Sequence, residues 1–324
     1  MIDDIKITML GTTGAGKTCY LLGMYSVMQT GVNGFTLSAK DMDVDLDLND
    51  LWEKLVDTQG EDRWPPPNAA EVKDYDFDFS YGFQHIMSYK WVDYRGRAMS
   101  DRSTEGDVQR LMEHFENSSC LFLCISGEYL KDQITPDTIR KLQSHRMTGF
   151  LQKISNQIKP TPNRPFPVAI VITKYDLCSE RKTQEIIEEI KQNLYPALFT
   201  PNSGWLVMIC PVSLGKDLSS DLDSGNISPE NVHLPVVFAI YSKLREHGLM
   251  LKGEQISSQG SLKSLENTNF FMKWLHSSEI KDQKDKLYKL GTEIQKIEKD
   301  MILLAQELQK VPVFLNGKEV TIDV

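Results

Sequence analysis

Residues 11–18 form a glycine-rich segment whose residue types suit the binding of a polyphosphate. The segment consists of Gly11, Thr12, Thr13, Gly14, Ala15, Gly16, Lys17 and Thr18, and Cys19 follows it. Glycines let main-chain N–H groups converge on phosphate oxygens, a lysine neutralises the β and γ phosphates, and a threonine hydroxyl can bind Mg²⁺. The spacing GxxxxGK[ST] therefore predicts that this loop, with Cys19, holds a nucleotide, that Lys17 serves catalysis and that Thr18 is a metal ligand. The alternative is a glycine turn of purely structural use.

A second short motif, DxxG, occupies the positions from Asp93 to Gly96. It follows a predicted strand, and a carboxylate at the carboxyl end of a sheet strand can hold Mg²⁺ through water. The Gly96 N–H can approach a γ phosphate because no side chain obstructs it. We therefore expect Asp93 to be a metal ligand and Gly96 to contact the nucleotide.

Two further strand ends carry residues that can select a base. They are Thr173, Lys174 and Asp176, which follow the apolar run 168–172, and Ser213, which follows the run 206–210. A lysine stem can cover a purine ring, and a carboxylate can accept the two N–H donors of the Watson–Crick edge of guanine, which adenine lacks. Ser213 can add main-chain contacts to the guanine oxygen. These residues predict GTP or GDP as the ligand, and a protein that uses ATP is the alternative if the match at 173–176 is accidental.

The four motifs, in this order at strand ends, resemble the translation-factor and Ras-like (TRAFAC) class of P-loop GTPases. They stand at Gly11–Thr18, Asp93–Gly96, Thr173–Asp176 and Pro211–Ser213, the positions of phosphate, Mg²⁺ and guanine recognition in that class. The resemblance covers residues 1–248. It implies a cytoplasmic molecular switch that binds GTP and GDP with Mg²⁺, hydrolyses GTP and contacts a protein partner through its switch regions.

The long separation between Lys17 and Asp93 implies an insertion in the first switch region, at about residues 31–74. This insertion, the dipeptide Trp64-Pro65 and the additional C-terminal elements are similar to those of the bacterial double-GTPase group found in conflict and defence gene clusters. Membership of that group would imply a role in such a system.

Two departures from the Ras-like pattern concern catalysis. Members of the class bind Mg²⁺ and the γ phosphate with a threonine in the first switch, but the segment from Gln59 to Lys90 contains no threonine. Asn68 is the positional candidate, with Thr58 or Thr36 as alternatives. The class also places a water-orienting glutamine directly after DxxG, where this chain has Arg97. We expect either slow hydrolysis without a partner, with Asn68 and Arg97 in catalysis, or a weakly active scaffold that holds GTP or GDP.

The arginines of the second switch, Arg95 and Arg97, allow two interpretations. An arginine in cis can stabilise transition-state charge and contributes a factor of about 10³ to 10⁵ to the rate where it is used. The other interpretation is a pair of solvated side chains on the switch loop. Both stay open at the level of the sequence.

The motifs are placed on alternating strand and helix patterns. Apolar runs predict strands at 5–10, 35–39, 120–125, 168–172 and 206–210, and aromatic alternation predicts a half-exposed strand at 75–83 that pairs with 85–92. Helical periodicity covers 18–28, 46–56, 108–116, 136–158, 184–194 and 232–246. Near-continuous apolar runs are typical of parallel strands buried on both faces. The pattern predicts an α/β fold with a doubly wound, mostly parallel sheet of the P-loop NTPase kind over residues 1–248, the GTPase domain.

The last part of the chain, 249–324, differs from the rest in composition and periodicity. We expect a linker and a short helix at 249–278, because the run Lys252–Ser264 is polar. Residues 279–324 combine a charged helix with two β runs on either side of Asn316-Gly317, a preferred hairpin turn. Apolar residues of the helix follow a coiled-coil spacing, at Leu287, Leu290, Ile294, Ile297, Met301, Leu304 and Leu308. This seam predicts a coiled-coil arm that packs either on its own domain or on a partner, in a homodimer or heterodimer.

The composition argues against several classes of protein. The chain of 324 residues has 36 Lys plus Arg against 45 Asp plus Glu, a net charge of −9, which disfavours a broad nucleic-acid or anionic-membrane footprint. No apolar stretch is long enough to cross a membrane, and the start lacks a leader pattern. We therefore expect a cytoplasmic protein without a membrane span. The five cysteines and six histidines show no metal-binding or redox spacing.

Overall fold

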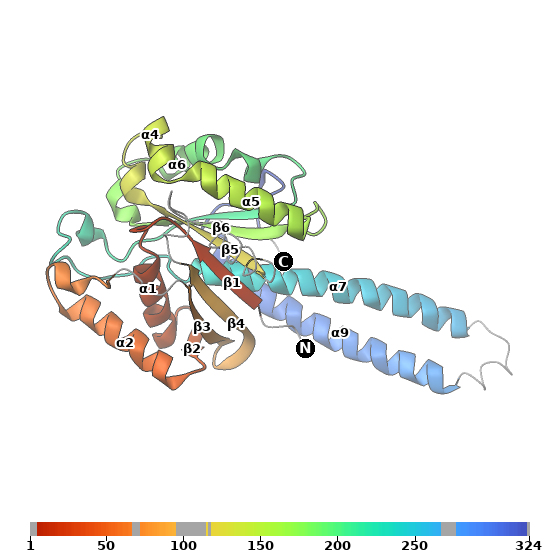
Figure 1. Cartoon of the computed structure of the whole chain (residues 1–324). Helices are drawn as coiled ribbons and strands as arrows, with labels where there is room; N and C mark the ends of the chain where they lie inside the picture. The colour runs from red at the N-terminus through yellow and green to blue at the C-terminus, as the bar shows by residue number, and fades with distance from the viewer. Residues whose placement is uncertain (1–4, 67–71, 95–114, 116–117, 267–276, 323–324) are drawn as a thin grey trace.

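The computed structural model describes residues 5–66, 72–94, 115, 118–266 and 277–322. These residues form one nine-stranded sheet with helices on both faces, and a pair of long helices extends away from it (Figure 1). The strand order along the sheet is β2-β3-β4-β1-β5-β6-β7-β8-β9. The strands are β1 (Ile5–Leu10), β2 (Phe35–Ala39), β3 (Val72–Tyr81), β4 (Gln84–Tyr94), β5 (Cys120–Ser126), β6 (Phe166–Thr173), β7 (Trp205–Pro211), β8 (Val313–Leu315) and β9 (Lys318–Val320).

The sheet is mixed, although its centre is parallel. The five central strands, β4, β1, β5, β6 and β7, pair in parallel. Strands β3 and β2 add antiparallel pairs at one edge, and β8 and β9 do so at the other. The α/β class is as predicted, but the expectation of a mostly parallel sheet is not met for the sheet as a whole. The reason is that a hairpin flanks the parallel centre on each side.

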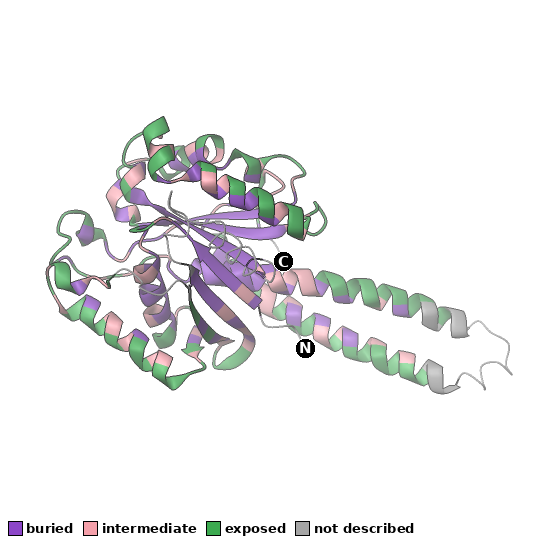
Figure 2. Cartoon of the chain, viewed as in Figure 1, coloured by how far each residue is buried: buried purple, intermediate pink, exposed green. Residues whose placement is uncertain are grey.

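Helices cover both faces of the parallel centre. The apolar core on one face includes side chains of α1 (Lys17–Thr30), α2 (Met42–Asp57) and α7 (Leu234–Glu266). The core on the other face includes side chains of α5 (Ser144–Ile158) and α6 (Thr183–Glu189), with α4 (Pro136–Lys141) packed beside them. Every residue of β5 and β6 is buried because these strands lie between the two layers (Figure 2). Burial on both faces explains their continuous apolar sequence.

Short helices shape the loops between these elements. They are η1 (Glu61–Arg63), η3 (Gly127–Leu130), η4 (Tyr175–Cys178), η5 (Ile190–Leu194), η6 (Pro196–Phe199) and η7 (Lys216–Ser219). The helix predicted at 136–158 is divided into α4 and α5 near Gln143, whose φ of 52° interrupts helical geometry. The helix predicted at 108–116 lies, apart from Phe115, outside the described residues.

The described part of the predicted insertion, residues 31–66, folds as β2, α2 and η1. Strand β2 pairs with β3, and α2 packs beside α1. Asp41 caps α2, because its side chain accepts a hydrogen bond from the Asp43 N–H at 2.9 Å. Asp43 and Asp45 lie in the first turn of the helix, where negative charge is stabilising. The insertion therefore packs as a structured part of the sheet domain.

The segment Lys252–Ser264, predicted to be a linker, is helical. Helix α7 continues without interruption to Glu266. Most polar side chains of this segment face solvent, whereas Leu251 and Ser258 are buried against the neighbouring helix. The prediction of a linker at Lys252–Ser264, within the stretch 249–278, is therefore wrong, and the reason is that a two-helix arm needs only a narrow apolar stripe.

The seam of α9 (Ser277–Leu308) is covered by α7 of the same chain, and the two helices run antiparallel (Figure 1). Five of its residues are buried, namely Leu290, Ile294, Ile297, Leu304 and Leu308. Polar pairs flank the seam, with His247 Nε2 at 3.1 Å from Glu293 Oε1 and Lys252 Nζ at 2.9 Å from Glu298 Oε1. The described residues thus show the seam packed within the chain. Neither these helices nor any other in the described ranges is long and apolar enough to span a membrane.

The C-terminal hairpin docks on the sheet, which an isolated hairpin needs in order to be stable. Strand β8 pairs with β7, with Leu315 opposite Leu206, and β9 pairs with β8. The turn contains Asn316 and Gly317, both at positive φ. A Cβ on Gly317 would lie 2.1 Å from the Phe199 carbonyl oxygen, so only glycine permits this approach.

A buried polar cluster joins the arm to the sheet domain. Glu307, near the end of α9, accepts hydrogen bonds from His233 Nε2 at 3.2 Å, Asn33 Nδ2 at 3.0 Å and Lys310 Nζ at 2.5 Å. Burial by itself would raise the pKa of Glu307, but the three hydrogen bonds outweigh it and lower that pKa. Burial lowers the pKa of His233 by more than Glu307 raises it. The folded cluster therefore favours a charged Glu307 and a neutral His233.

We predict that acidification destabilises this junction through His233. The pKa of His233 in the folded chain lies below its ordinary value of 6.5. As the pH falls through 6.5, His233 therefore takes up a proton in the unfolded chain before it does so in the folded chain. This difference in bound protons lowers the free energy of unfolding as the pH falls. The melting temperature of the wild type should fall between about pH 7.5 and about pH 5.5. His233→Gln, which keeps a donor for Glu307, should lose this part of the dependence. His247→Gln is the matched control, and identical pH dependence in wild type and His233→Gln would contradict the assignment.

Candidate nucleotide site

A cavity of about 860 Å³ opens at the carboxyl ends of the parallel strands. It is bordered by the glycine loop between β1 and α1, by η3 after β5, by η4 after β6 and by the loop after β7. Residues 64–66 of the insertion close it from another side. In open α/β sheets, ligands bind at this edge because the loops that follow the strands converge there.

The glycine loop lies at one end of the cavity and adopts a conformation that requires glycine. Gly14 and Gly16 have φ of 79° and 77°, which side chains rarely adopt. A Cβ on Gly11 would lie 2.9 Å from the Cβ of Cys124, so the loop also packs tightly on β5. Helix α1 begins directly after the loop and has no acidic residue in its first turn. Its free N–H groups and positive dipole end make this end of the cavity suited to an anion.

Lys17 provides a positive charge at the same end. Its side chain is largely buried, and Nζ donates hydrogen bonds to the carbonyl oxygens of Gly11 at 3.2 Å and Thr12 at 3.5 Å. Residues 13–18 border the cavity directly. Gly11 and Thr12 do not border it, and their carbonyl oxygens position the Lys17 side chain instead. Cys19 also borders the cavity, and burial raises the pKa of its thiol to about 11. Cys19 is therefore a neutral wall residue and not a thiolate nucleophile.

Thr18 and Asp93, the predicted metal ligands, both border the cavity. Asp93 lies near the end of β4 and pairs in register with Met9 of β1, the strand that leads into the glycine loop. A hydroxyl and a carboxylate are the oxygen donors that Mg²⁺ prefers. The described residues contain no group of three or more His, Cys, Asp or Glu side chains that could hold a metal by themselves. Thr18 and Asp93 could each supply one oxygen ligand to an Mg²⁺ ion whose other ligands are phosphate or water oxygens.

Thr173, predicted to contact the nucleotide, ties the glycine loop to the sheet. Its buried Oγ1 lies 2.6 Å from the Ala15 carbonyl oxygen and 3.2 Å from the Ile125 carbonyl oxygen. It also lies within 3.4 Å of the position that a Cβ on Gly16 would take. Thr173 borders the cavity, but its hydroxyl is used to position the loop.

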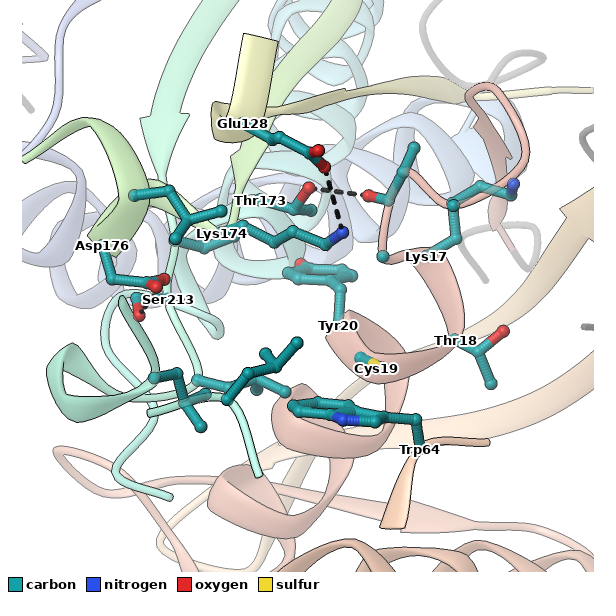
Figure 3. Close-up of a pocket in the computed structure, with 18 of the residues that line it drawn as sticks. Lys17, Thr18, Cys19, Tyr20, Trp64, Glu128, Thr173, Lys174, Asp176 and Ser213 are labelled. Atoms are coloured by element: carbon teal, nitrogen blue, oxygen red, sulfur yellow. Dashed lines mark hydrogen bonds and ion pairs between the residues drawn. The ribbon is translucent and has the colours of Figure 1, made fainter. Parts of the chain in front are cut away.

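Asp176 and Ser213 form a pair at the opposite end of the cavity. Ser213 Oγ donates to Asp176 Oδ1 at 2.8 Å and accepts the Gly215 N–H at 3.0 Å. Burial raises the pKa of Asp176 above its ordinary value, although the Ser213 hydrogen bond opposes the shift. Figure 3 shows Lys17 and Thr18 on one side of the cavity and Asp176 with Ser213 on the other. The Ser213 hydrogen bond therefore fixes the orientation of the Asp176 carboxylate, on the opposite side of the cavity from Lys17 and Thr18.

Lys174 lies between these two ends (Figure 3). It adopts a left-handed conformation, with φ of 50°, and its Nζ lies 3.8 Å from Glu128 Oε2. The backbone of Lys174 can approach β5 this closely because residue 127 is glycine: a Cβ there would lie 2.5 Å from the Lys174 carbonyl oxygen. The long stem of Lys174 thus borders the middle of the cavity.

Several residues that border the cavity were not predicted as site residues. Glu128 comes from η3 and Lys131 follows it directly, and Leu218 and Leu222 come from the loop after β7. Trp64 comes from the insertion, and its buried indole N–H has no hydrogen-bond acceptor among the described residues. The one signal for Trp64 was its place before three consecutive prolines.

Four predicted residues lie outside the described residues: Asn68, Arg95, Gly96 and Arg97. Their roles stay predictions. Of the alternatives to Asn68, Thr36 lies within β2 and Thr58 follows α2, and neither borders the cavity.

Comparisons with known proteins add little. No protein-family model matches the chain, and no curated protein matches it. Among solved structures, nucleolar GTP-binding protein 1 of Plasmodium falciparum is similar, with 12% identity and a TM-score of 0.37 over 80% of this chain and 97% of that chain. A likeness at this level does not establish a shared fold, so the site itself has to support any function.

We predict that Thr173→Val loosens the glycine loop. Valine has nearly the shape of threonine but leaves the Ala15 and Ile125 carbonyls without their hydroxyl donor, which should cost about 1–3 kcal/mol in the free energy of unfolding. Urea denaturation measures the loss, and Thr173→Ser, which keeps the hydroxyl, is the control. A Thr173→Val protein as stable as Thr173→Ser would contradict this role.

Proposed function

We propose that the chain binds GTP and GDP with Mg²⁺, hydrolyses GTP slowly by itself and couples its nucleotide state to a protein partner. The observation that supports this most is the placement of two different recognition sets at opposite ends of one cavity. Lys17 and Thr18 suit a polyphosphate, and Asp176 with Ser213 suits a purine edge (Figure 3). A glycine turn of purely structural use would not require the second set.

The base end favours guanine over adenine. One oxygen of Asp176 accepts from Ser213, and the carboxylate retains acceptor capacity for two N–H donors. Guanine presents two such donors side by side on its Watson–Crick edge, and adenine does not. The stem of Lys174 would cover the ring. The alternative of an ATP-binding protein is therefore disfavoured, because adenine offers the carboxylate a single N–H donor beside a ring acceptor, where guanine offers two donors.

The phosphate end would hold the charged part of the nucleotide. The N–H groups of residues 13–18 and the start of α1 would bind phosphate oxygens, and Lys17 would exchange its loop carbonyls for the β and γ phosphates. Thr18 directly, and Asp93 through water, would hold Mg²⁺, which neutralises charge on the phosphates when bound. Gly96 would approach the γ phosphate with its main-chain N–H.

Hydrolysis would depend on the switch segments. In this proposal Asn68 takes the place of the usual switch threonine, and Arg97, or Arg95, stabilises charge in the transition state. The lack of a threonine from Gln59 to Lys90 and of a glutamine after Gly96 supports a slow rate. The partner would be a protein that contacts the switch segments and the helical arm, in a homodimer or heterodimer, and a cytoplasmic role in a bacterial defence system follows from the sequence resemblance.

The same two departures also favour a second candidate function. The chain would then be a scaffold or regulatory subunit that holds GTP or GDP and does not turn it over. The nucleotide content of the purified protein separates the two: retained GTP supports the scaffold, whereas GDP or a mixture supports turnover.

We predict that Asp176→Asn changes base preference. Asparagine replaces one acceptor oxygen by an NH₂ donor, which repels the guanine edge and suits the additional carbonyl of xanthine. GTP affinity should fall at least about a hundredfold, and xanthosine triphosphate should bind better than GTP. Competition against a fluorescent guanine nucleotide measures both, with Asp132→Asn on the exposed surface as the control. Unchanged selectivity would exclude Asp176 from base recognition.

We predict that Lys17→Ala abolishes GTP turnover. Without the ammonium group, the phosphate end loses its buried positive charge, and the rate should fall by about 10² or more. Phosphate release from GTP and from ATP in Mg²⁺ is measured side by side, with Lys153→Ala on the exposed face of α5 as the control. Equal turnover by wild type and Lys17→Ala would place the activity elsewhere, and tight GTP binding without any turnover would favour the scaffold.

A further inference from the structure

An arginine of the insertion is buried against the loop on the base side of the cavity. Arg63, in η1, is only 3% exposed. Its Nη1 donates to three carbonyl oxygens of the loop formed by residues 214–228, those of Leu222 at 3.4 Å, Asp223 at 3.2 Å and Gly225 at 3.2 Å. Its Nε donates to the Leu55 carbonyl oxygen at 3.1 Å. The guanidinium thus joins two segments that are far apart in the sequence.

A second bond reinforces the same junction. The Gly60 N–H donates to the Asp223 carbonyl oxygen at 3.0 Å. Gly60 has φ of 77°, so this turn suits glycine. The 214–228 loop is itself compact, because a Cβ on Gly225 would lie 2.4 Å from the Asp221 carbonyl oxygen. The junction therefore connects two well-packed segments.

Both segments border the cavity, and the 214–228 loop packs beside η4, which carries Asp176. Trp64, directly after Arg63, and Pro65 border it on the insertion side, and Leu218 and Leu222 border it on the loop side. The Arg63 guanidinium lies 5.4 Å from the centre of the Trp64 ring, within cation–π range. In Figure 3 Trp64 lies across the cavity from Lys174, and Asp176 and Ser213 border the space at the side. Arg63 therefore holds together two chain segments that both border the cavity.

Arginine suits this role better than other residues. It has five N–H donors in a planar fork and stays charged, so that one side chain can satisfy several carbonyls at once. Burying a guanidinium costs free energy that only such hydrogen bonds offset. Its loss would leave the carbonyls of Leu222, Asp223 and Gly225 without this donor and would free the two walls to separate.

We propose that Arg63 is a positioning residue that clamps the insertion onto the 214–228 loop and thereby sets how slowly a guanine nucleotide leaves the cavity. The proposal rests on the proposed nucleotide-binding function. It adds a control of nucleotide release that lies outside the four sequence motifs, at the base end of the cavity. A partner that displaces the insertion would open this clamp.

The test compares release of a fluorescent GDP analogue from the wild type and from Arg63→Met, which keeps the length of the side chain without its donors. Release should become about tenfold faster, the effect of losing one hydrogen bond to a charged group. Arg140→Met, which removes an exposed arginine of α4, should release at the wild-type rate. The affinity for inorganic tripolyphosphate, measured by competition, should change by less than about twofold, because the clamp acts on the base end.

A second variant keeps the proposal testable if Arg63→Met does not fold. Gly60→Ala strains the turn that donates to Asp223 and should also speed release, by about threefold. Gly149→Ala in α5, where a Cβ meets nothing within 4 Å, is its control. A folded Arg63→Met or Gly60→Ala protein that releases nucleotide at the wild-type rate, or that loses tripolyphosphate affinity as much as GTP affinity, would overturn the clamp. If the wild type binds no guanine nucleotide at all, the proposed function fails as well.

Discussion

The burial of the parallel strands on both faces is the constraint on which the rest of the structure depends. Strands β5 and β6 have no solvent-facing residue, so polar side chains and irregular backbone collect at the carboxyl edge, where the loops can satisfy them. The Thr173 hydroxyl, at the end of β6, then holds the glycine loop in position on β5, because it bonds the Ala15 carbonyl of the loop and the Ile125 carbonyl of β5. Lys17 and Thr18 at one end of the cavity, and Asp176 and Ser213 at the other, keep a constant separation because both sets extend from this sheet.

Much of this site could be predicted from the sequence, since its motifs are local. Glycines at positive φ, a lysine at the start of a helix and polar residues directly after apolar strands are properties of neighbouring residues, and Lys17, Thr18, Asp93, Asp176 and Ser213 all border the cavity. The class of fold follows from the alternation of strands and helices. Arg97 and Asn68 lie outside the described residues and keep the status of predictions.

The features that the sequence did not predict depend on distant contacts. The antiparallel edge beside β7 arises because the C-terminal hairpin returns to pair with that strand, and nothing in residues 313–320 specifies β7 as its partner. The sequence predicts a linker where α7 is in fact a continuous helix. The reason is that α7 buries only a narrow apolar stripe against α9, so that Lys252–Ser264 has the composition of a linker. The contacts of Arg63 join residues about 160 positions apart, and its type alone gives no sign that it is buried.

The most direct test of the central claim, that one cavity recognises both ends of a guanine nucleotide, is a calorimetric titration of the full chain with GTP and with ATP in Mg²⁺. The account predicts one GTP per chain and an affinity for ATP at least about a hundredfold lower, because only guanine offers two adjacent N–H donors to the buried carboxylate of Asp176. Equal affinities for the two nucleotides, or no binding of either, would contradict it.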